Sequence, residues 1–174
     1  MQLTIQQKYL LDFLKKLGCA RRDQLYALAG SQDGLPGGRI RPQHVDAMLR
    51  QLRHCVSEVR IDGDLVYYGR DSPDADRVEA IDVMLQLTEG RPLDFWLMRD
   101  AALLLRFTCE SEGKIRLFCV ARLLESHPIS AQHTERIVFL VGNGKFPTGL
   151  SLPYKHFFAL RQEDGTHRFF ASGD

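Results

Sequence analysis

One segment of the sequence carries hydrogen-bonding side chains of the types that read the edges of DNA bases. Arg50 can donate two hydrogen bonds to O6 and N7 of a guanine, and Gln43 or Gln51 can pair in a similar way with N6 and N7 of an adenine. His44 and His54 lie among them and are suited to phosphate contacts. These residue types and their spacing predict recognition of bases in duplex DNA.

Arginines flank this segment on both sides and are suited to contacts with backbone phosphates. They are Arg39, Arg41, Arg60 and Arg70. Residues 1–70 hold 11 Lys and Arg against 7 Asp and Glu, a balance of +4, whereas residues 71–174 hold 12 against 15, a balance of −3. The net charge of +1 therefore conceals a basic N-terminal part, where a polyanionic partner is expected.

Base-reading side chains need a rigid element to present them, and the pattern predicts a helix. Pro42 suits the first turn of a helix, where its missing N–H is not required. Val45, Met48, Leu49 and Leu52 follow at i, i+3, i+4 and i+7, so they share one apolar face. The polar side chains then lie together on the opposite face.

Two further helices are predicted before this one. Thr4 is a favourable N-cap and Gly18 a favourable C-terminal residue for a helix over about 4–17. A shorter helix is predicted from about 22 to 29. Four turn-forming residues then indicate a Gly-rich loop over 31–41.

A β-hairpin is predicted after the polar helix. Residues 56–68 are rich in β-branched and aromatic residues, and the dipeptide Asp62-Gly63 interrupts them at a position typical of a tight turn. Three helices followed by a hairpin are typical of a winged helix-turn-helix. We predict such a domain over 1–70.

A connecting helix and a second domain are predicted for the rest of the chain. Ser72 as a cap and Pro73 in the first turn indicate a helix over about 73–88, within a connecting segment 71–90. Residues 91–174 alternate apolar runs with turns, which predicts a small α+β domain with a mostly antiparallel or mixed sheet.

The strands expected in this second domain are short and separated by Gly-containing turns or longer connections. A short helix is expected to begin within Ser130–Glu135. The predicted strands cover about 94–98, 102–109, 114–121, 136–141, 156–161 and 167–171.

Several patterns bear on catalysis, and none of them predicts an enzyme. Glu112-Gly113-Lys114 spells the Glu-x-Lys of metal-dependent nucleases, with Asp94 or Asp100 as the upstream carboxylate, but the triplet falls in a predicted turn. The Gly-rich loop lacks the Lys-Ser/Thr of a phosphate-binding P-loop. We therefore expect no catalytic residues, no metal and no cofactor, with a nuclease-like enzyme as an alternative.

Composition and hydropathy exclude several other classes. Hydrophobic residues make up 44% and charged residues 26% of the chain, as in ordinary globular proteins. The longest apolar runs, 101–105 and 137–141, are too short to span a membrane, and the N-terminus lacks the apolar core of a signal peptide. The four widely spaced cysteines include no Cys-x-x-Cys pair. These features predict a cytoplasmic protein with reduced thiols and no membrane partner.

Short motifs at the starts of the first two predicted helices resemble those of the replication-relaxation family. The matching residues are Thr4, Gln7, Asp23, Gln24 and Leu25. Similarity extends over about residues 3–70. That family comprises winged-helix proteins of plasmids and integrative elements, with an α+β domain of nuclease-like shape after the winged helix. The resemblance implies a DNA-binding accessory protein of a mobile element, although the long Gly-rich loop departs from the family pattern.

The sequence therefore predicts a sequence-specific duplex-DNA-binding protein with an accessory role or a role in transcription regulation, and with a non-catalytic C-terminal assembly domain. A homodimer is expected, because such proteins pair half-sites. The predicted helix 73–88 or the C-terminal sheet is the expected interface, since the helix carries apolar residues on more than one face, at 78, 81, 85 and at 83, 84, 87. The alternative from another class is a protein-interaction module built on the same scaffold.

Overall fold

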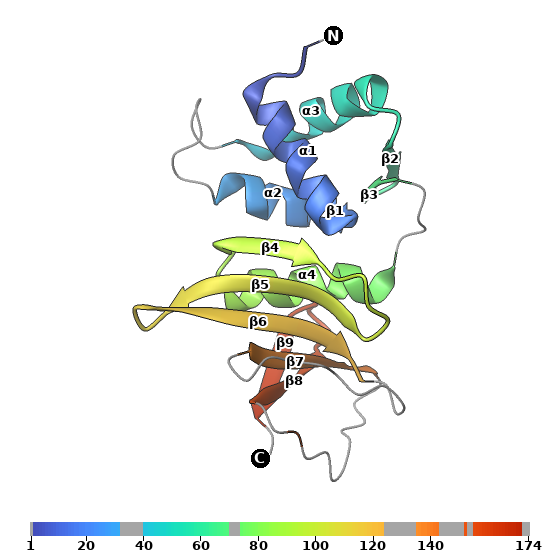
Figure 1. Ribbon diagram of the computed structural model, residues 1–174. Coiled ribbons are helices and arrows are strands. Elements are labelled where there is room, and N and C mark those ends of the chain that lie inside the picture. Colours follow the sequence, from blue (N-terminus) through green and yellow to red (C-terminus); the bar gives the residue numbers. More distant parts are fainter. Residues whose placement is uncertain are drawn as a thin grey trace. The chain divides into compact units, whose positions relative to one another are not determined.

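The computed structural model describes residues 2–31, 40–69, 74–123, 135–142, 152 and 155–171. It divides into two compact units, unit 1 (Met1–Ile81) and unit 2 (Asp82–Asp174). The described residues form four helices and nine strands in two sheets (Figure 1). The protein is therefore of the mixed α+β class that the sequence predicts.

The first helix of unit 1 lies within the limits that its capping residues predict. In α1 (Ile5–Leu17), the Thr4 hydroxyl accepts a hydrogen bond from the backbone N–H of Gln7, and the Gln7 side chain accepts one from the N–H of Thr4. This reciprocal capping box satisfies two donors that the helix leaves unpaired. Gly18 ends the helix with a φ of 70°, which a residue with a side chain rarely adopts.

The second helix of unit 1 agrees with its predicted limits to within one residue, and the third begins at its predicted first residue. They are α2 (Arg22–Gly30) and α3 (Pro42–Cys55). α3 begins at Pro42, as predicted, and the predicted apolar stripe of α3 is its buried face. Most of the predicted Gly-rich loop, including Arg39, lies outside the described residues.

A small antiparallel sheet completes unit 1. It consists of β1 (Cys19–Arg21), β2 (Val59–Asp62) and β3 (Leu65–Tyr68) in the order β1-β3-β2. β2 and β3 form the predicted hairpin, with Gly63 in its turn at a φ of 56°. β1 was not predicted, because three residues show too little alternation to indicate a strand.

Helix α4 (Ala75–Leu87) contributes to both units, since the division between them falls within it. At the start of this helix, Oδ1 of Asp74 accepts from the N–H groups of Asp76 and Arg77. The predicted cap Ser72 and Pro73 lie outside the described residues. In unit 1, the buried side-chain amide of Gln24 donates to the carbonyl oxygen of Val78 at 2.8 Å. This bond fixes the first half of α4 against α2.

Unit 2 contains one six-stranded mixed sheet in the order β4-β5-β6-β7-β8-β9 (Figure 1). The pairs β6–β7 and β7–β8 are parallel, and the other three pairs are antiparallel. The strands are β4 (Asp94–Leu97), β5 (Leu103–Ser111), β6 (Lys114–Arg122), β7 (Glu135–Val141), β8 (His156–Arg161) and β9 (His167–Ala171).

β7 begins one residue earlier than predicted. Glu135 is its first residue and pairs with Leu117, so it does not belong to the short helix predicted from Ser130. The other residues of that predicted helix lie outside the described part of the chain.

A side chain of α4 protects the edge strand β9. The Gln86 amide donates to the carbonyl oxygen of His167 at 2.6 Å and accepts from the N–H of the same residue at 2.7 Å. Both backbone groups of His167 point away from β8, so Gln86 satisfies them where no further strand follows in the sheet order. Blocking an edge in this way hinders strand addition from another chain.

Four of the six predicted apolar positions of α4 are buried in the single chain, whereas Leu85 and Leu87 are partly exposed. Val78, Ile81, Val83 and Met84 are between 0% and 8% exposed. These four side chains give no apolar surface to a second copy, which leaves the partly exposed Leu85 and Leu87 as the apolar side chains that α4 can offer. Among the described residues, none of the helices has the length and apolar character that crossing a membrane requires.

All four cysteines are free, and Cys19, Cys109 and Cys119 are buried. Burial raises the pKa of the Cys119 thiol to about 12, with a further increase from the nearby Glu135 carboxylate. Burial also raises the pKa of Cys19 and of Cys109. Because the thiolate is the reactive form, these three thiols are expected to be inert in the folded protein.

At pH 8, an aromatic disulfide reagent is therefore expected to label one thiol per native chain rapidly, at the exposed Cys55, and the others only after unfolding. Absorbance of the released thiolate measures both phases. A Cys55→Ser variant should lose the rapid phase. Rapid labelling of that variant would show that a buried cysteine is accessible.

Candidate nucleic-acid interface

The exposed face of α3 brings together most of the side chains that the sequence assigns to base recognition. Gln43, Ala47, Arg50 and His54 recur at i, i+4, i+7 and i+11, and all four are exposed. The opposite face is 0% to 7% exposed. Since one helical turn takes 3.6 residues, these four positions form one continuous stripe along the helix.

Ion pairing and hydrogen bonding fix the orientation of α3 relative to α2. Oδ1 of Asp46, on α3, accepts from Nη1 of Arg22 at 2.8 Å and from the hydroxyl of Tyr26 at 2.8 Å. Arg22 also donates from Nε to the carbonyl oxygen of Gly63 at 3.3 Å. One arginine therefore links α2, α3 and the turn of the hairpin.

Partial burial acts to raise the pKa of Asp46, but hydrogen bonds from Tyr26 and Arg22, together with the charge of Arg22, lower it overall. A carboxyl whose pKa is lower in the folded state stabilises the fold above its unfolded pKa and loses that contribution as pH falls through the folded value. The link between α2 and α3 is therefore intact at neutral pH and weakens only in acid.

Gln51 has a structural partner that the sequence pattern did not reveal. Its Oε1 atom accepts from Nε2 of Gln7 at 2.5 Å, which connects α3 to the capping box of α1. Gln7 is 4% exposed, so its amide depends on this partner. Adenine recognition needs both ends of the Gln51 amide, and one end is already engaged.

The first turn of α3 presents further predicted residues to solvent. Arg41 occupies the N-cap position, where its carbonyl oxygen accepts from the N–H groups of His44 and Val45. The side chains of Arg41 and His44 are exposed. Near the middle of the helix, Nε of Arg50 donates to the carbonyl oxygen of Asp46 at 3.3 Å. That bond leaves the terminal nitrogens of Arg50 for other contacts.

Arg60 lies on the hairpin rather than on the helix. Its guanidinium carbon is 4.7 Å from the ring centroid of Tyr67, and its Nη2 atom donates to the carbonyl oxygen of Gly69 at 2.6 Å. Stacking on a ring and binding a carbonyl both restrict the side chain. Arg60 is therefore held along the hairpin, with a fixed position for its charge.

The Glu-x-Lys triplet of unit 2 lies at the turn between β5 and β6, as predicted. Glu112 has a φ of 55° in this turn and forms an ion pair with Arg116, and Lys114 is the first residue of β6. Within the described ranges, no three His, Cys, Asp or Glu side chains form a group that can hold a metal ion. The carboxylate of the triplet, Glu112, is therefore paired with an arginine side chain.

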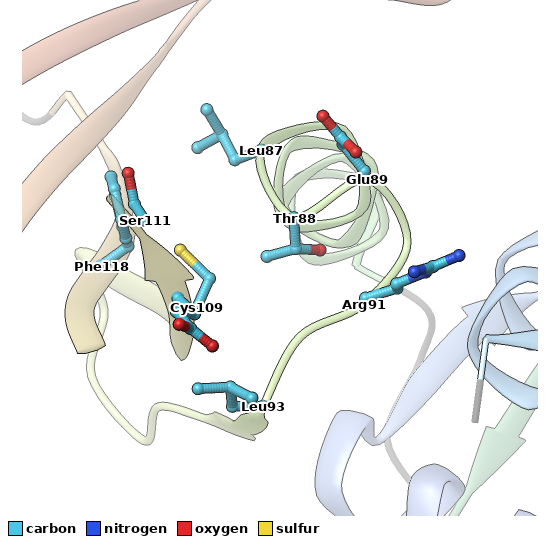
Figure 2. Close-up of a pocket in the computed structure, with 9 residues that line it drawn as sticks. Leu87, Thr88, Glu89, Arg91, Leu93, Cys109, Ser111 and Phe118 are labelled. Carbon is cyan, nitrogen blue, oxygen red and sulfur yellow. The ribbon is translucent and has the colours of Figure 1, made fainter. Parts of the chain in front are cut away.

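Unit 2 also contains a pocket that the sequence did not predict (Figure 2). It encloses about 560 Å³, within the range of small-molecule sites. In Figure 2, Cys109 and Thr88 face the same space, and Arg91 points away from it. The lining residues are Leu87, Thr88, Glu89, Arg91, Leu93, Cys109, Glu110, Ser111 and Phe118. The lining therefore combines apolar side chains with hydroxyl and charged ones.

No family model matches the chain, and neither a curated protein nor a solved structure matches it.

Proposed function

We propose that unit 1 is a winged helix-turn-helix domain and that α3 binds duplex DNA in the major groove. The order of its elements, three helices with a short strand after the first and a hairpin after the third, is typical of that domain. In this arrangement α3 reads bases and the hairpin lies beside the phosphate backbone.

The observation that carries the proposal is the separation of the two faces of α3. A helix that only packs on its own domain needs no particular chemistry on its exposed face. Here the centre of that face holds Gln43, Arg50 and His54, which can all form hydrogen bonds with bases or phosphates. Asp46, the acidic residue of this helix, is paired with Arg22 and does not repel DNA as a free charge.

The cations around α3 are placed for backbone contacts. Arg41 stands at the N-terminus of the helix, where the helix dipole also favours a phosphate, and Arg60 is held on the hairpin. The turn of the hairpin carries the exposed Asp62 and Asp64. A hairpin with two acidic residues at its tip is expected to touch the flank of the duplex rather than to enter a groove.

The function we infer is sequence-specific DNA binding in an accessory or regulatory role, with unit 2 as a non-catalytic assembly domain. The resemblance of the N-terminal motifs to the replication-relaxation family supports a place on a plasmid or integrative element. A homodimer remains part of the proposal, with an interface outside the buried positions of α4.

The test is the affinity of the full chain for random-sequence duplex DNA, measured by fluorescence anisotropy at several salt concentrations. Arg41→Ala is expected to weaken binding to all sequences alike and to reduce the slope of log K against log salt by about 0.9, the value for one lost phosphate contact. Arg161→Ala, which removes one exposed charge from unit 2, is the matched control.

An unchanged slope in Arg41→Ala would remove this residue from the interface. Absence of wild-type binding even at low salt would contradict DNA binding and favour a protein partner for the same face of α3.

A further inference from the structure

The hairpin of β5 and β6 extends beyond the neighbouring strands of the sheet. β7 begins at Glu135, which pairs with Leu117, so among the described residues Lys114–Arg116 of β6 have no pairing with β7. On the other side, the pairing of β4 with β5 begins at Asp94 and Thr108. The notch beside the start of β7 is lined by Thr108, Lys114, Ile115, Arg116, Leu117 and Arg136 and encloses about 380 Å³.

The charged side chains in this notch are all cationic. Lys114 and Arg116 are two residues apart on one strand and therefore point to the same side of the sheet. Arg136 pairs with Phe118 in the next register position on that side, and its guanidinium carbon is 5.7 Å from the Phe118 ring centroid. The three cations thus follow β6 and continue onto β7.

Few anions oppose these three charges. Glu112 pairs with Arg116, but the Glu112 side chain is 80% exposed, so the pair is solvated and contributes little. Glu135, the neighbour of Arg136, is fully buried and bound in both oxygens by Arg106. The notch therefore keeps a positive potential, although residues 71–174 as a whole carry a balance of −3.

One donor in the notch has no acceptor. Nε of Arg116 is buried and lacks a hydrogen-bond partner within the described part of the chain. A buried N–H without a partner is uncommon, because leaving it unsatisfied costs free energy. An oxygen atom supplied from outside the chain would satisfy it.

We propose that this basic notch binds the phosphate backbone of a nucleic acid and gives the protein a second contact in addition to that of α3. The spacing of Lys114 and Arg116, about 6.8 Å for two residues of a strand, is on the scale of the distance between successive phosphates in a nucleic-acid strand. Ile115, 74% exposed at the same place, offers an apolar contact to a sugar or a base.

This second contact rests on the proposed function, because it assumes the same nucleic acid. The test uses the full chain, a long random-sequence duplex and the double variant Lys114→Ala/Arg136→Ala. Loss of two phosphate contacts is expected to reduce the salt slope by about 1.8. The wild type should then lose about 12-fold more affinity than the double variant between 50 and 200 mM salt.

The matched control is Arg161→Ala/Arg168→Ala, which removes two exposed cations near the turn between β8 and β9. It should leave the salt slope close to that of the wild type. An equal decrease in both double variants would show a general charge effect and overturn the proposal.

Two other anions test whether the notch binds nucleic acid or a different anionic ligand. Inorganic phosphate and poly-glutamate are each titrated against the wild type, with the backbone amide NMR signals of the notch as the readout. Saturation by either one, combined with an unchanged DNA salt slope in the double variant, would overturn the assignment to nucleic acid. Perturbation of these amides by duplex DNA, lost in the double variant, would support it.

The failure of this inference differs from the failure of the proposed function. If variants of α3 reduce DNA binding and the notch variant does not, the proposed function stands and the proposed contact at the notch is contradicted. If the notch variant reduces binding and α3 variants do not, the proposed contact at the notch is supported and recognition of DNA by α3 is contradicted.

Discussion

Replacement of Glu135 by leucine is expected to lower the free energy of unfolding of unit 2 by about 3–5 kcal/mol. The Glu135 side chain is fully buried and accepts from Nε of Arg106 at 2.6 Å and from Nη2 of the same residue at 3.1 Å. Removing the carboxylate leaves the guanidinium in the fold without its partner. Since the Arg106 side chain is 21% exposed and water can reach it, we expect a value near the lower limit.

Urea unfolding followed by the fluorescence of Trp96 measures this loss. Trp96 is the single tryptophan of the chain and pairs with Arg106 across β4 and β5, so it reports on unit 2. The slope of free energy against urea should not change, which would show that only stability is altered.

The double variant Glu135→Leu/Arg106→Met is the control for this experiment. A buried ion pair can be exchanged for apolar residues of similar size at little cost, whereas the loss of one partner is strongly destabilising. We therefore expect the second substitution to recover most of the lost stability. A double variant as unstable as the single one would mean that Glu135 acts through packing and not through its charge.

The sequence predicted those elements whose limits are set by local chemistry. Thr4 and Gly18 define α1 because caps act on the nearest turn. β8 and β9 occur at the predicted residues 156–161 and 167–171, since alternating side chains and an intervening turn are local signals.

Features that depend on distant pairing could not be predicted in the same way. β1 is recognisable only because Cys19 pairs with Tyr67 of β3. The parallel pairing of β6 with β7 depends on the course of the chain between them, which no local pattern specifies. A carboxylate is rare in a buried strand without a partner, and the partner of Glu135, Arg106, is 29 residues away in the sequence.

The sequence predicted which side chains form the candidate interface, but not the contacts that hold α3 in place behind them. The helical period placed Gln43, Arg50 and His54 on one exposed face, and the structure has them there. The helical period did not indicate that Gln51 binds Gln7, 44 residues earlier, or that Asp46 binds Arg22, 24 residues earlier. Both contacts are made on the flanks of the exposed face, where a helix meets its neighbours and where sequence period alone does not separate solvent from protein.

The side chain with the largest expected effect on specificity is Arg50, at the centre of the exposed face of α3. If it forms a paired contact with guanine, Arg50→Ala should weaken binding to the preferred site by about 1–3 kcal/mol, roughly 5- to 150-fold. Binding to random duplex should change much less, because most random sequences place no guanine where Arg50 can form the paired contact. The preferred site is first obtained by selection from a random pool, and both affinities are measured by anisotropy.

Two variants separate base recognition by Arg50 from the simple loss of a charge. Arg50→Lys keeps the charge but not the two-pronged geometry, so it should lose specificity and retain the salt slope of the wild type. Arg53→Ala removes a cation from the last turn of the same helix, away from the central stripe, and should preserve specificity. Arg50 is exposed and its bond to the Asp46 carbonyl lies within the helix, so circular dichroism should show an unchanged fold in all three. Equal losses on the preferred and random duplexes in Arg50→Ala would mean that α3 contacts the backbone alone and that sequence is read elsewhere or not at all.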